Sequence, residues 1–258
     1  MKNKISGKIV ALLLTLIIVA TSGMPLYAKE TGDKANSFRY ENGQSIAKAV
    51  PFSTLSPNAW KKIDGKYYSG DGSVIEGAVA KGIDVSHHQG TVDWKKAKED
   101  GVEFAIIRCG FGMNQTKQDD AQWFNNVKGC EENNIPYGVY LYSYADTVKK
   151  AQSEAEHVLR LIKGHTLAYP VYYDIEEKAV LNKLTAEQLG KIAATFVNKV
   201  KAEGYQTGIY SNKSNFETFL TDSQFSQWNK WVAQYNSAAC TYKGTYQIWQ
   251  AADTGTID

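Results

Sequence analysis

Cysteine is scarce in this chain, which has three cysteines among 258 residues: Cys109, Cys130 and Cys240. Their number is odd, they lie far apart, and no two of them form a CxxC pair, so the sequence indicates neither a disulfide scaffold nor a zinc site. The spacing allows one Cys109–Cys130 bridge, but the expectation is that the thiols are free and buried.

Several motifs of nucleotide and nucleophile chemistry are also missing. No GxGxxG follows the first expected strand and no Walker motif occurs, which argues against a nucleotide site. The chain has no GxSxG, so a serine nucleophile is not indicated. His87 and His88 are adjacent, point apart on an extended segment, and have no third ligand at metal spacing. The sequence therefore predicts neither a metal nor a cofactor.

A large excess of charge of one sign is absent. The formal net charge is +2, from 29 basic and 27 acidic residues, which leaves no electrostatic footprint for nucleic acid. The longest apolar run, residues 9–20, spans about 18 Å as a helix and is too short for a hydrocarbon core of ~30 Å. Three lysines precede it and small residues follow up to Ala28. Residues 1–28 are thus predicted to be a cleaved signal peptide, so the mature protein would be secreted and would not stay inserted in a membrane.

The segment at residues 29–80 is predicted to be a polar linker followed by a short β-hairpin. The hairpin is expected at residues 60–68, around an Asp64-Gly65 turn. Its aromatic pattern weakly resembles one repeat of the aromatic cell-wall-binding modules. Because a lone repeat is marginal, a hairpin that packs on the main domain is the favoured interpretation.

From Lys81 to Asp258 the sequence alternates between apolar strands and helices. Strands are expected at residues 82–86, 102–109, 137–144, 169–175, 206–211, 230–235 and 245–250. Helices are expected at residues 94–100, 119–133, 147–161 (capped by Asp146) and 186–203 (with a capping box from Thr185 to Gln188). Such alternation predicts an α/β fold with a parallel sheet covered on both sides, and a (β/α) barrel is favoured over an open sheet.

In such folds the functional residues follow the carboxyl ends of the strands. Asp174 and Glu176 end the fourth expected strand and, two residues apart, face the same way with Cα atoms about 6.6 Å apart. Two close carboxyls in a partly desolvated cleft do not both ionise easily, which provides a general acid beside a charged partner, as glycoside cleavage requires. A solvated acidic strand end is the alternative, and Asp84 at the end of the first strand argues against it.

Seven motifs in order resemble glycoside hydrolase family 25, the Chalaropsis-type lysozymes or N-acetylmuramidases. The first is GIDVSHHQG at residues 82–90, followed by VDW at residues 92–94. The others are FAIIR at 104–108, YGVY at 137–140, VYYDIE at 171–176, GIYS at 208–211, WVAQY at 231–235 and IWQ at 248–250. The resemblance covers residues 81–258.

This resemblance implies an irregular (β/α)8 barrel with fewer outer helices than usual. It implies an enzyme, expected to be a monomer, that cleaves the β-1,4 bond between N-acetylmuramic acid and N-acetylglucosamine in bacterial peptidoglycan. By resemblance, Glu176 is the general acid, Asp174 stabilises the positive charge that develops at the sugar, and Asp84 is a further active-site carboxylate. Four strand-end residues are expected to contact sugar: Tyr142, Tyr210, Gln234 and Trp249.

The sequence departs from the family pattern at its end. The family carries another active-site aspartate after the Trp-Gln strand, and Asp258 comes too soon after Gln250 to be that residue. The barrel is therefore expected to lack its last strand. A peptidoglycan-binding protein without turnover, or another N-acetyl-sugar glycosidase such as a chitinase, remains an alternative.

Overall fold

The computed structural model describes residues 40–41, 44–45, 61–69, 71–235 and 239–253. All of these belong to one unit, Ala35–Asp258. The predicted signal peptide, residues 1–28, and the final residues 254–258 lie outside the described part of the chain.

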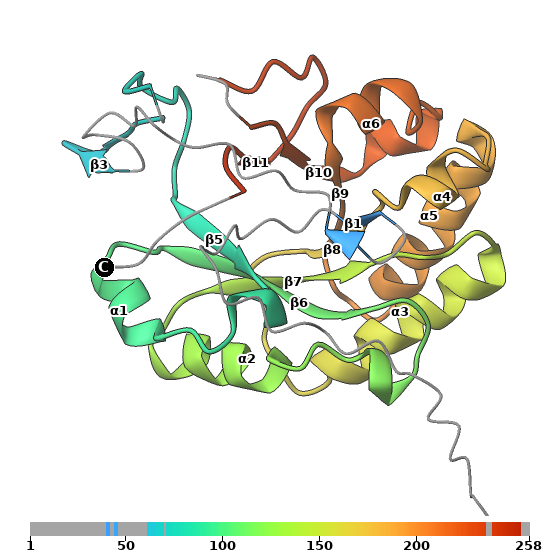
Figure 1. The fold of residues 1–258 in the computed structure, drawn as a ribbon, viewed down its shortest axis with the longest axis horizontal. Coiled ribbons are helices and arrows are strands. Elements are labelled where there is room, and N and C mark those ends of the chain that lie inside the picture. Colours follow the sequence, from blue (N-terminus) through green and yellow to red (C-terminus); the bar gives the residue numbers. More distant parts are fainter. Residues whose placement is uncertain (1–39, 42–43, 46–60, 70, 236–238, 254–258) are drawn as a thin grey trace, which may run out of the picture. The chain divides into compact units, whose positions relative to one another are not determined.

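Seven parallel strands form the central sheet, and each pairs with the strand next to it in the sequence (Figure 1). They are β5 (Gly82–Val85), β6 (Phe104–Phe111), β7 (Tyr137–Tyr142), β8 (Val171–Asp174), β9 (Thr207–Asn212), β10 (Asn229–Ala233) and β11 (Ile248–Gln250). A side-chain hydrogen bond between Gln250 of β11 and Asp84 of β5 joins the two edge strands, so the sheet curls into a half-barrel. The parallel, barrel-like α/β fold expected from the sequence is confirmed.

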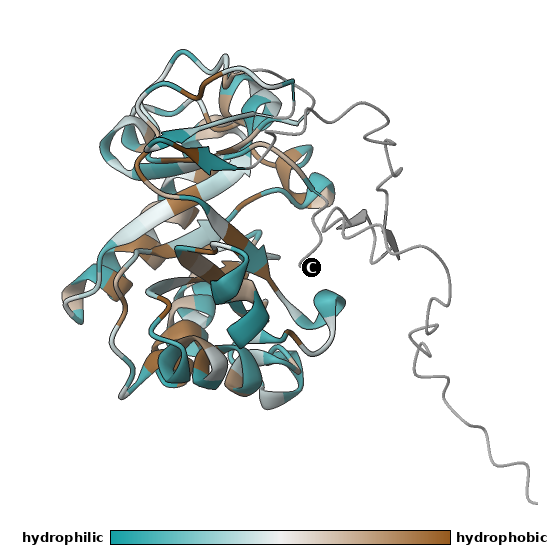
Figure 2. Cartoon of the chain, turned by 90° about the vertical axis from the view of Figure 1, so that its left-hand side faces the viewer, coloured by the Kyte–Doolittle hydropathy of each residue, from teal (hydrophilic) through white to brown (hydrophobic). Residues whose placement is uncertain are grey.

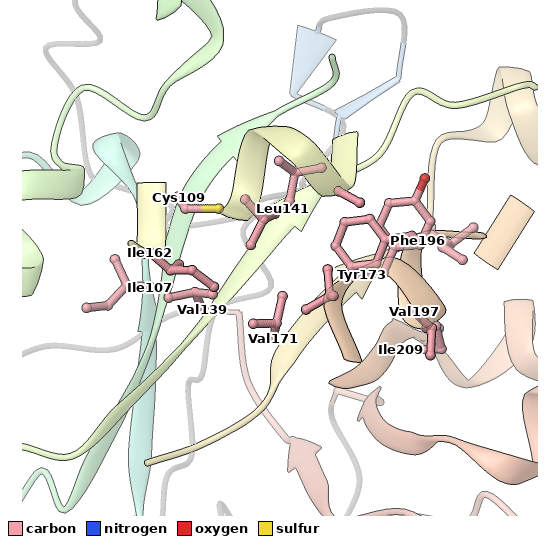
Figure 3. Packing of buried hydrophobic residues seen from close by; sticks show 14 of the residues in the cluster. Ile107, Cys109, Val139, Leu141, Ile162, Val171, Tyr173, Phe196, Val197 and Ile209 are labelled. Carbon is pink, nitrogen blue, oxygen red and sulfur yellow. The ribbon is translucent and has the colours of Figure 1, made fainter. Parts of the chain in front are cut away.

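The outer face of this sheet packs against helices. They are α1 (Trp94–Glu99), α2 (Trp123–Glu132), α3 (Val148–Ile162), α4 (Lys178–Leu181), α5 (Ala186–Ala202) and α6 (Lys213–Thr218). Figure 2 shows hydrophobic and hydrophilic residues on the same helices, as amphipathic packing requires. Aliphatic strand residues meet α3 and α5 in one core, where the Tyr173 ring stacks on Phe196 at 3.9 Å between centroids (Figure 3). None of the helices in the described ranges is long and apolar enough to cross a membrane.

Helix caps show which local expectations hold. The predicted capping box is confirmed, because Thr185 Oγ1 accepts a hydrogen bond from Gln188 N and Gln188 Oε1 accepts one from Thr185 N. The expectation that Asp146 caps α3 is wrong. Thr147 is the N-cap, and its hydroxyl accepts from Lys150 N. The Asp146 carboxylate instead pairs with the ammonium groups of two lysines, Lys150 and Lys183.

The N-terminal hairpin consists of β3 (Lys62–Ile63) and β4 (Lys66–Tyr67), paired antiparallel. Asp64 and Gly65 both have positive φ, 50° and 77°, as a type I′ turn requires, so the predicted turn is confirmed. The Tyr67 hydroxyl donates to Glu103 Oε2 at 2.7 Å, and Lys62 Nζ lies 2.9 Å from Glu103 Oε1. The hairpin therefore packs on the start of β6, as the favoured interpretation predicted. A second antiparallel pair is formed by β1 (Tyr40–Glu41) and β2 (Gln44–Ser45).

The three cysteines are free, and Cys109 and Cys130 are buried without forming a bridge to each other. Burial raises the pKa of the Cys109 thiol, so it stays protonated. Its Sγ donates to the carbonyl oxygen of Tyr140. These thiols belong to the core.

Candidate active site

Strand register places one buried carboxyl between two buried tyrosines. Asp174 at the end of β8 pairs with Tyr142 of β7 on one side and with Tyr210 of β9 on the other. Residues in register on parallel strands point to the same face, and here that face is the inner one, where Tyr210 packs on Trp231 at 4.3 Å between ring centroids. Burial raises the pKa of both tyrosines, so their hydroxyl groups remain neutral.

Asp174 and Glu176 share this inner face. Ile175, between them, is buried in the outer core, so its two neighbours point the other way. Asp174 is 2% exposed, whereas Glu176 is partly exposed. Burial first, and then the negative charge of Glu176, raise the pKa of Asp174 well above its ordinary value. The predicted pair therefore lies together, and its buried member binds a proton more readily than an ordinary aspartate.

Asp84 approaches the same pair from the first strand. Its charge contributes to the raised pKa of Asp174. Burial raises the pKa of Asp84 itself to about 7, against the effect of a hydrogen bond of 2.8 Å from Gln250 Nε2. The Tyr235 hydroxyl donates to Gln250 Oε1 at 3.3 Å, which fixes the orientation of the amide. Three carboxyl groups from two strands thus meet, and burial raises the pKa of two of them, Asp84 and Asp174.

A buried arginine lies beside these acids. Arg108 of β6 is 5% exposed, and its Nε donates to Asp120 Oδ2 at 2.7 Å. Its positive charge opposes the rise in the pKa of Asp174. Burial alone would raise the pKa of Asp120, but a hydrogen bond from His87 and the charge of Arg108 outweigh it and lower that pKa to about 2. Asp120 therefore stays ionised and holds the guanidinium in place.

The two histidines after β5, His87 and His88, lie next to the Arg108–Asp120 pair. The backbone N–H of His87 donates to Asp120 Oδ2 at 3.1 Å, and its ring also contacts Arg108. Burial lowers the pKa of His88 to about 3, so its ring is neutral. In the described part of the chain, no group of three or more His, Cys, Asp or Glu residues is arranged to hold a metal ion.

The turn after Glu176 is fixed by its neighbour. Glu177 is 4% exposed and caps α4, since its Oε1 accepts from Ala179 N at 3.2 Å. Its Oε2 accepts from the Tyr142 hydroxyl at 3.3 Å. The same carboxylate thereby connects the loop that carries Glu176 to the tyrosine beside Asp174.

Gln234 and Trp249, predicted from their strand-end positions, lie on the opposite face. Register pairs Trp249 with Val232 of the outer core, and Gln234 follows the inward-facing Ala233. The side-chain amide of Gln234 forms hydrogen bonds with the backbone N–H and the hydroxyl of Thr241. The backbone carbonyl oxygen of Gln234 accepts a hydrogen bond of 2.9 Å from Trp249 Nε1. Tyr235, which follows Gln234, and Gln250, which follows Trp249, lie on the inner side.

Sequence reasoning therefore placed the three acids and two tyrosines together but did not select Arg108, Asp120 or Gln250 as site residues. A signal for two of them exists: Arg108 and Gln250 are polar residues at inward-facing positions of their strands, in step with Phe104 and Ile106 of β6 and with Ile248 of β11. Asp120 offers no such signal, because it lies in the loop before α2 and its burial depends on the arginine.

Comparisons with known proteins identify relatives of this chain. The sequence model of the family described as Glycosyl hydrolases family 25 matches residues 83–258. The autolytic lysozyme of Clostridium acetobutylicum is 26% identical over 178 residues, which are 69% of this chain and 52% of that protein. Lysozyme M1 of Streptomyces globisporus is 23% identical over 246 residues, 83% of this chain and 81% of that protein.

Solved structures give the same result. The modular autolysin LytC from Streptococcus pneumoniae, in complex with a synthetic peptidoglycan ligand, superposes with a TM-score of 0.64 and 31% identity over 75% of this chain and 48% of that one. The bacterial lysozyme from Streptomyces coelicolor shares the fold, with a TM-score of 0.60 and 24% identity over 68% of this chain and 85% of that one. The chain spans about half the length of the autolytic lysozyme and of LytC.

Proposed function

The chain belongs to glycosyl hydrolase family 25, and on this premise we propose that it is a lysozyme that cleaves the β-1,4 bond between N-acetylmuramic acid and N-acetylglucosamine in bacterial peptidoglycan. One observation carries the proposal beyond family membership. Asp84, Asp174 and Glu176 lie on one face at the carboxyl ends of the strands, and Asp174 lies between two tyrosines. Carboxyl groups with unequal environments are the requirement for acid-assisted glycoside hydrolysis.

We assign the general-acid role to Glu176, which is the most accessible of the pair. Its proton passes to the glycosidic oxygen as the bond to the anomeric carbon of N-acetylmuramic acid breaks. Asp174 then stabilises the positive charge at the sugar, directly or through the N-acetyl group of the substrate. Water adds at the anomeric carbon, its proton returns to a carboxylate, and the product has a new reducing end. Asp84 is a further carboxylate of the same cluster.

Burial suggests where the proton rests before substrate binds. Asp174 is the buried member of the pair, and its raised pKa favours the neutral form in the free enzyme. A sugar seated over Glu176 would remove water from that carboxyl and favour its neutral form instead. The proton would then move from Asp174 to Glu176, which leaves a negative charge beside the sugar where positive charge develops.

Other parts of the proposal concern binding and location. Tyr142 and Tyr210, on both sides of Asp174, are the proposed sugar contacts nearest the acids. Sugar contacts by Gln234 and Trp249 remain a prediction, since both residues belong to the outer side of the rim. We further propose that residues 1–28 are a signal peptide, that residues 81–258 are the catalytic domain, and that the protein acts outside the cell, on the cell wall, as a monomer.

The test is to incubate the purified protein with peptidoglycan and to identify the released fragments by mass spectrometry. New reducing ends at N-acetylmuramic acid are expected. Reducing ends at N-acetylglucosamine would instead mean a different glycosidase. Binding to peptidoglycan without release would mean a binding protein without turnover.

The matched variant is Glu176→Gln, which removes the acidic proton and preserves the shape of the side chain. Loss of a general acid is expected to lower the rate by about 10²–10⁴-fold while peptidoglycan binding persists. Glu187→Gln is the control, because Glu187 lies exposed on α5 in an ion pair with Lys191. Unchanged cleavage by Glu176→Gln would exclude the assigned role.

A further inference from the structure

Three aromatic rings, those of Tyr142, Tyr144 and Phe111, lie in a row beside the acid cluster formed by Asp84, Asp174 and Glu176. Tyr142 lies beside Asp174 and is buried, and the ring of Tyr144 lies 5.0 Å from it between centroids. Phe111 of β6 meets Tyr144 edge-on at 6.4 Å. Tyr144 is 37% exposed although it contacts two other rings. The row therefore presents one accessible ring next to the candidate active site.

A buried carboxyl group binds the backbone of Tyr144. Its N–H donates to Glu154 Oε1 at 2.9 Å, and Glu154, on α3, is 0% exposed. Glu154 Oε2 accepts from the hydroxyl groups of Ser143, at 2.8 Å, and Tyr173, at 2.5 Å. The N–H of Ser143 in turn donates to the carbonyl oxygen of Asp174 at 2.9 Å. One helix residue thus fixes the segment that joins Tyr144 to the strand of Asp174.

The ring of Tyr144 lies against a second fixed loop. Gly112 has φ +63°, and a Cβ there would lie 3.5 Å from Tyr144 Cδ2, so the ring lies against glycine backbone. The Gly112 N–H donates to the carbonyl oxygen of Tyr142 at 2.9 Å. Its own carbonyl accepts from Nδ1 of His157, which is fully buried one turn after Glu154 on α3. A single face of α3 therefore holds both the segment that carries Tyr144 and the loop against which its ring lies.

From this arrangement we propose that Tyr144 is a substrate-binding residue that stacks on a pyranose ring of the glycan strand, next to the sugar bound at the acid cluster. Tyrosine combines a flat apolar face with a polar hydroxyl, which suits the alternating apolar faces and hydroxyl edges of sugars. Because Glu154 binds the backbone of Tyr144 and Gly112 lies against its ring, the ring loses little conformational entropy when a ligand binds. The inference rests on the proposed function, because the ligand is the same glycan strand.

The experiment measures binding and turnover separately. Binding of purified soluble glycan fragments of peptidoglycan to the Glu176→Gln protein is followed by calorimetry, with Tyr144→Ala, Tyr144→Leu and Tyr144→Phe added to that background. Alanine and leucine are expected to weaken binding about tenfold, because neither provides a flat ring. Phenylalanine is expected to retain binding to within about twofold, since it preserves the stacking face. In the active protein, alanine is expected to raise KM with little change in kcat.

Phe124→Ala is the matched control, since Phe124 is an exposed aromatic residue on α2, 71% exposed, and is expected to change neither binding nor KM. Unchanged binding by Tyr144→Ala, with a thermal melting curve like that of its parent, would overturn the role of Tyr144 while the proposed function stands. Failure of the Glu176→Gln parent to bind, together with failure of the wild-type protein to cleave, would overturn both.

Discussion

The side chain of Gln250 donates a hydrogen bond of 2.8 Å to Asp84, although 166 positions separate the two residues. Gln250 ends β11 and Asp84 is the last residue but one of β5, and these are the two edge strands of the seven-stranded sheet. Their contact therefore spans the open side of the half-barrel. It also means that the orientation of one candidate catalytic carboxyl depends on a strand from the other end of the domain.

Removing this donor is expected to change the titration of Asp84. The hydrogen bond from Gln250 favours the ionised carboxylate, so Gln250→Met is expected to raise the pKa of Asp84 above its value of about 7. NMR titration of the aspartate carboxyl carbons, with Asp84→Asn to assign the signal, measures the shift. A pKa that stays the same or falls would mean that the hydrogen bond does not stabilise the charge.

The stability of the protein should depend on pH through the same residue. Burial raises the pKa of Asp84 from 3.8 to about 7, so between these values the folded state binds more protons than the unfolded state. The free energy of unfolding should therefore fall as pH rises from 4 to 7, with a contribution from Asp84 of at most about 4 kcal/mol.

Urea denaturation of the wild type and of Asp84→Asn at pH 5 and pH 8 checks this expectation. Glu154, whose pKa burial also raises to about 7, adds a slope of the same sign in both proteins. Because the charge of Asp84 also raises the pKa of Asp174, the difference between the two proteins gives the contribution of Asp84 together with its effect on Asp174. The variant should lose less stability over this interval, and equal slopes would contradict the prediction.

The Asp120 carboxylate should be important for folding. Asp120→Ala deprives the buried guanidinium of Arg108 of this partner and is expected to destabilise the protein by about 3–5 kcal/mol. Glu187→Ala, which breaks the exposed pair with Lys191, should cost less than about 1 kcal/mol. Adding Arg108→Met to Asp120→Ala is expected to restore part of the loss in urea denaturation. A double variant less stable than Asp120→Ala would contradict the pairing argument.

The hairpin contact is expected to matter for stability and not for catalysis. Tyr67→Phe removes the hydroxyl that donates to Glu103 and should cost about 1 kcal/mol in the free energy of unfolding. The rate of peptidoglycan cleavage should stay within about twofold of the wild type, because Glu103 precedes β6 and the acid cluster follows the opposite ends of the strands. A larger fall in rate, without loss of folding, would show that the hairpin acts on the site.

Local sequence patterns predicted much of this fold because a few neighbouring residues determine them. The capping box at Thr185 and the turn at Asp64-Gly65 each depend on four or fewer positions. The shared face of Asp174 and Glu176 follows from the two-residue period of a strand. Helices α4 and α6, with four and six residues, were not predicted, because so short a helix gives little periodic signal. Helix α1, also of six residues, was predicted because Asp93 and Gly101 mark its two ends.

Local sequence patterns did not predict the contacts between elements that lie far apart in the sequence. The Gln250–Asp84 hydrogen bond depends on how far the sheet curls, and the burial of Glu154 depends on how α3 packs against β7 and β8. Sequence alone also did not show that Gln234 and Trp249 lie on the face opposite to the acids, because a shift of one residue along a strand reverses the face of a side chain. Asp146 was taken as the cap of α3 because sequence alone does not show that two lysines bind it.

The hairpin's attachment to Glu103 has a mechanical consequence. Glu103 binds Lys62, Tyr67 and the N–H of Lys81, so tension applied to the chain ahead of the hairpin would enter the barrel at the start of β6. We expect that load to act along β6, parallel to its neighbours β5 and β7, and to be shared as shear by two ladders of hydrogen bonds. Arg108, beside the acid cluster, belongs to the same strand, so such a load would reach the acid cluster only after the hydrogen bonds at the start of β6 have carried part of it.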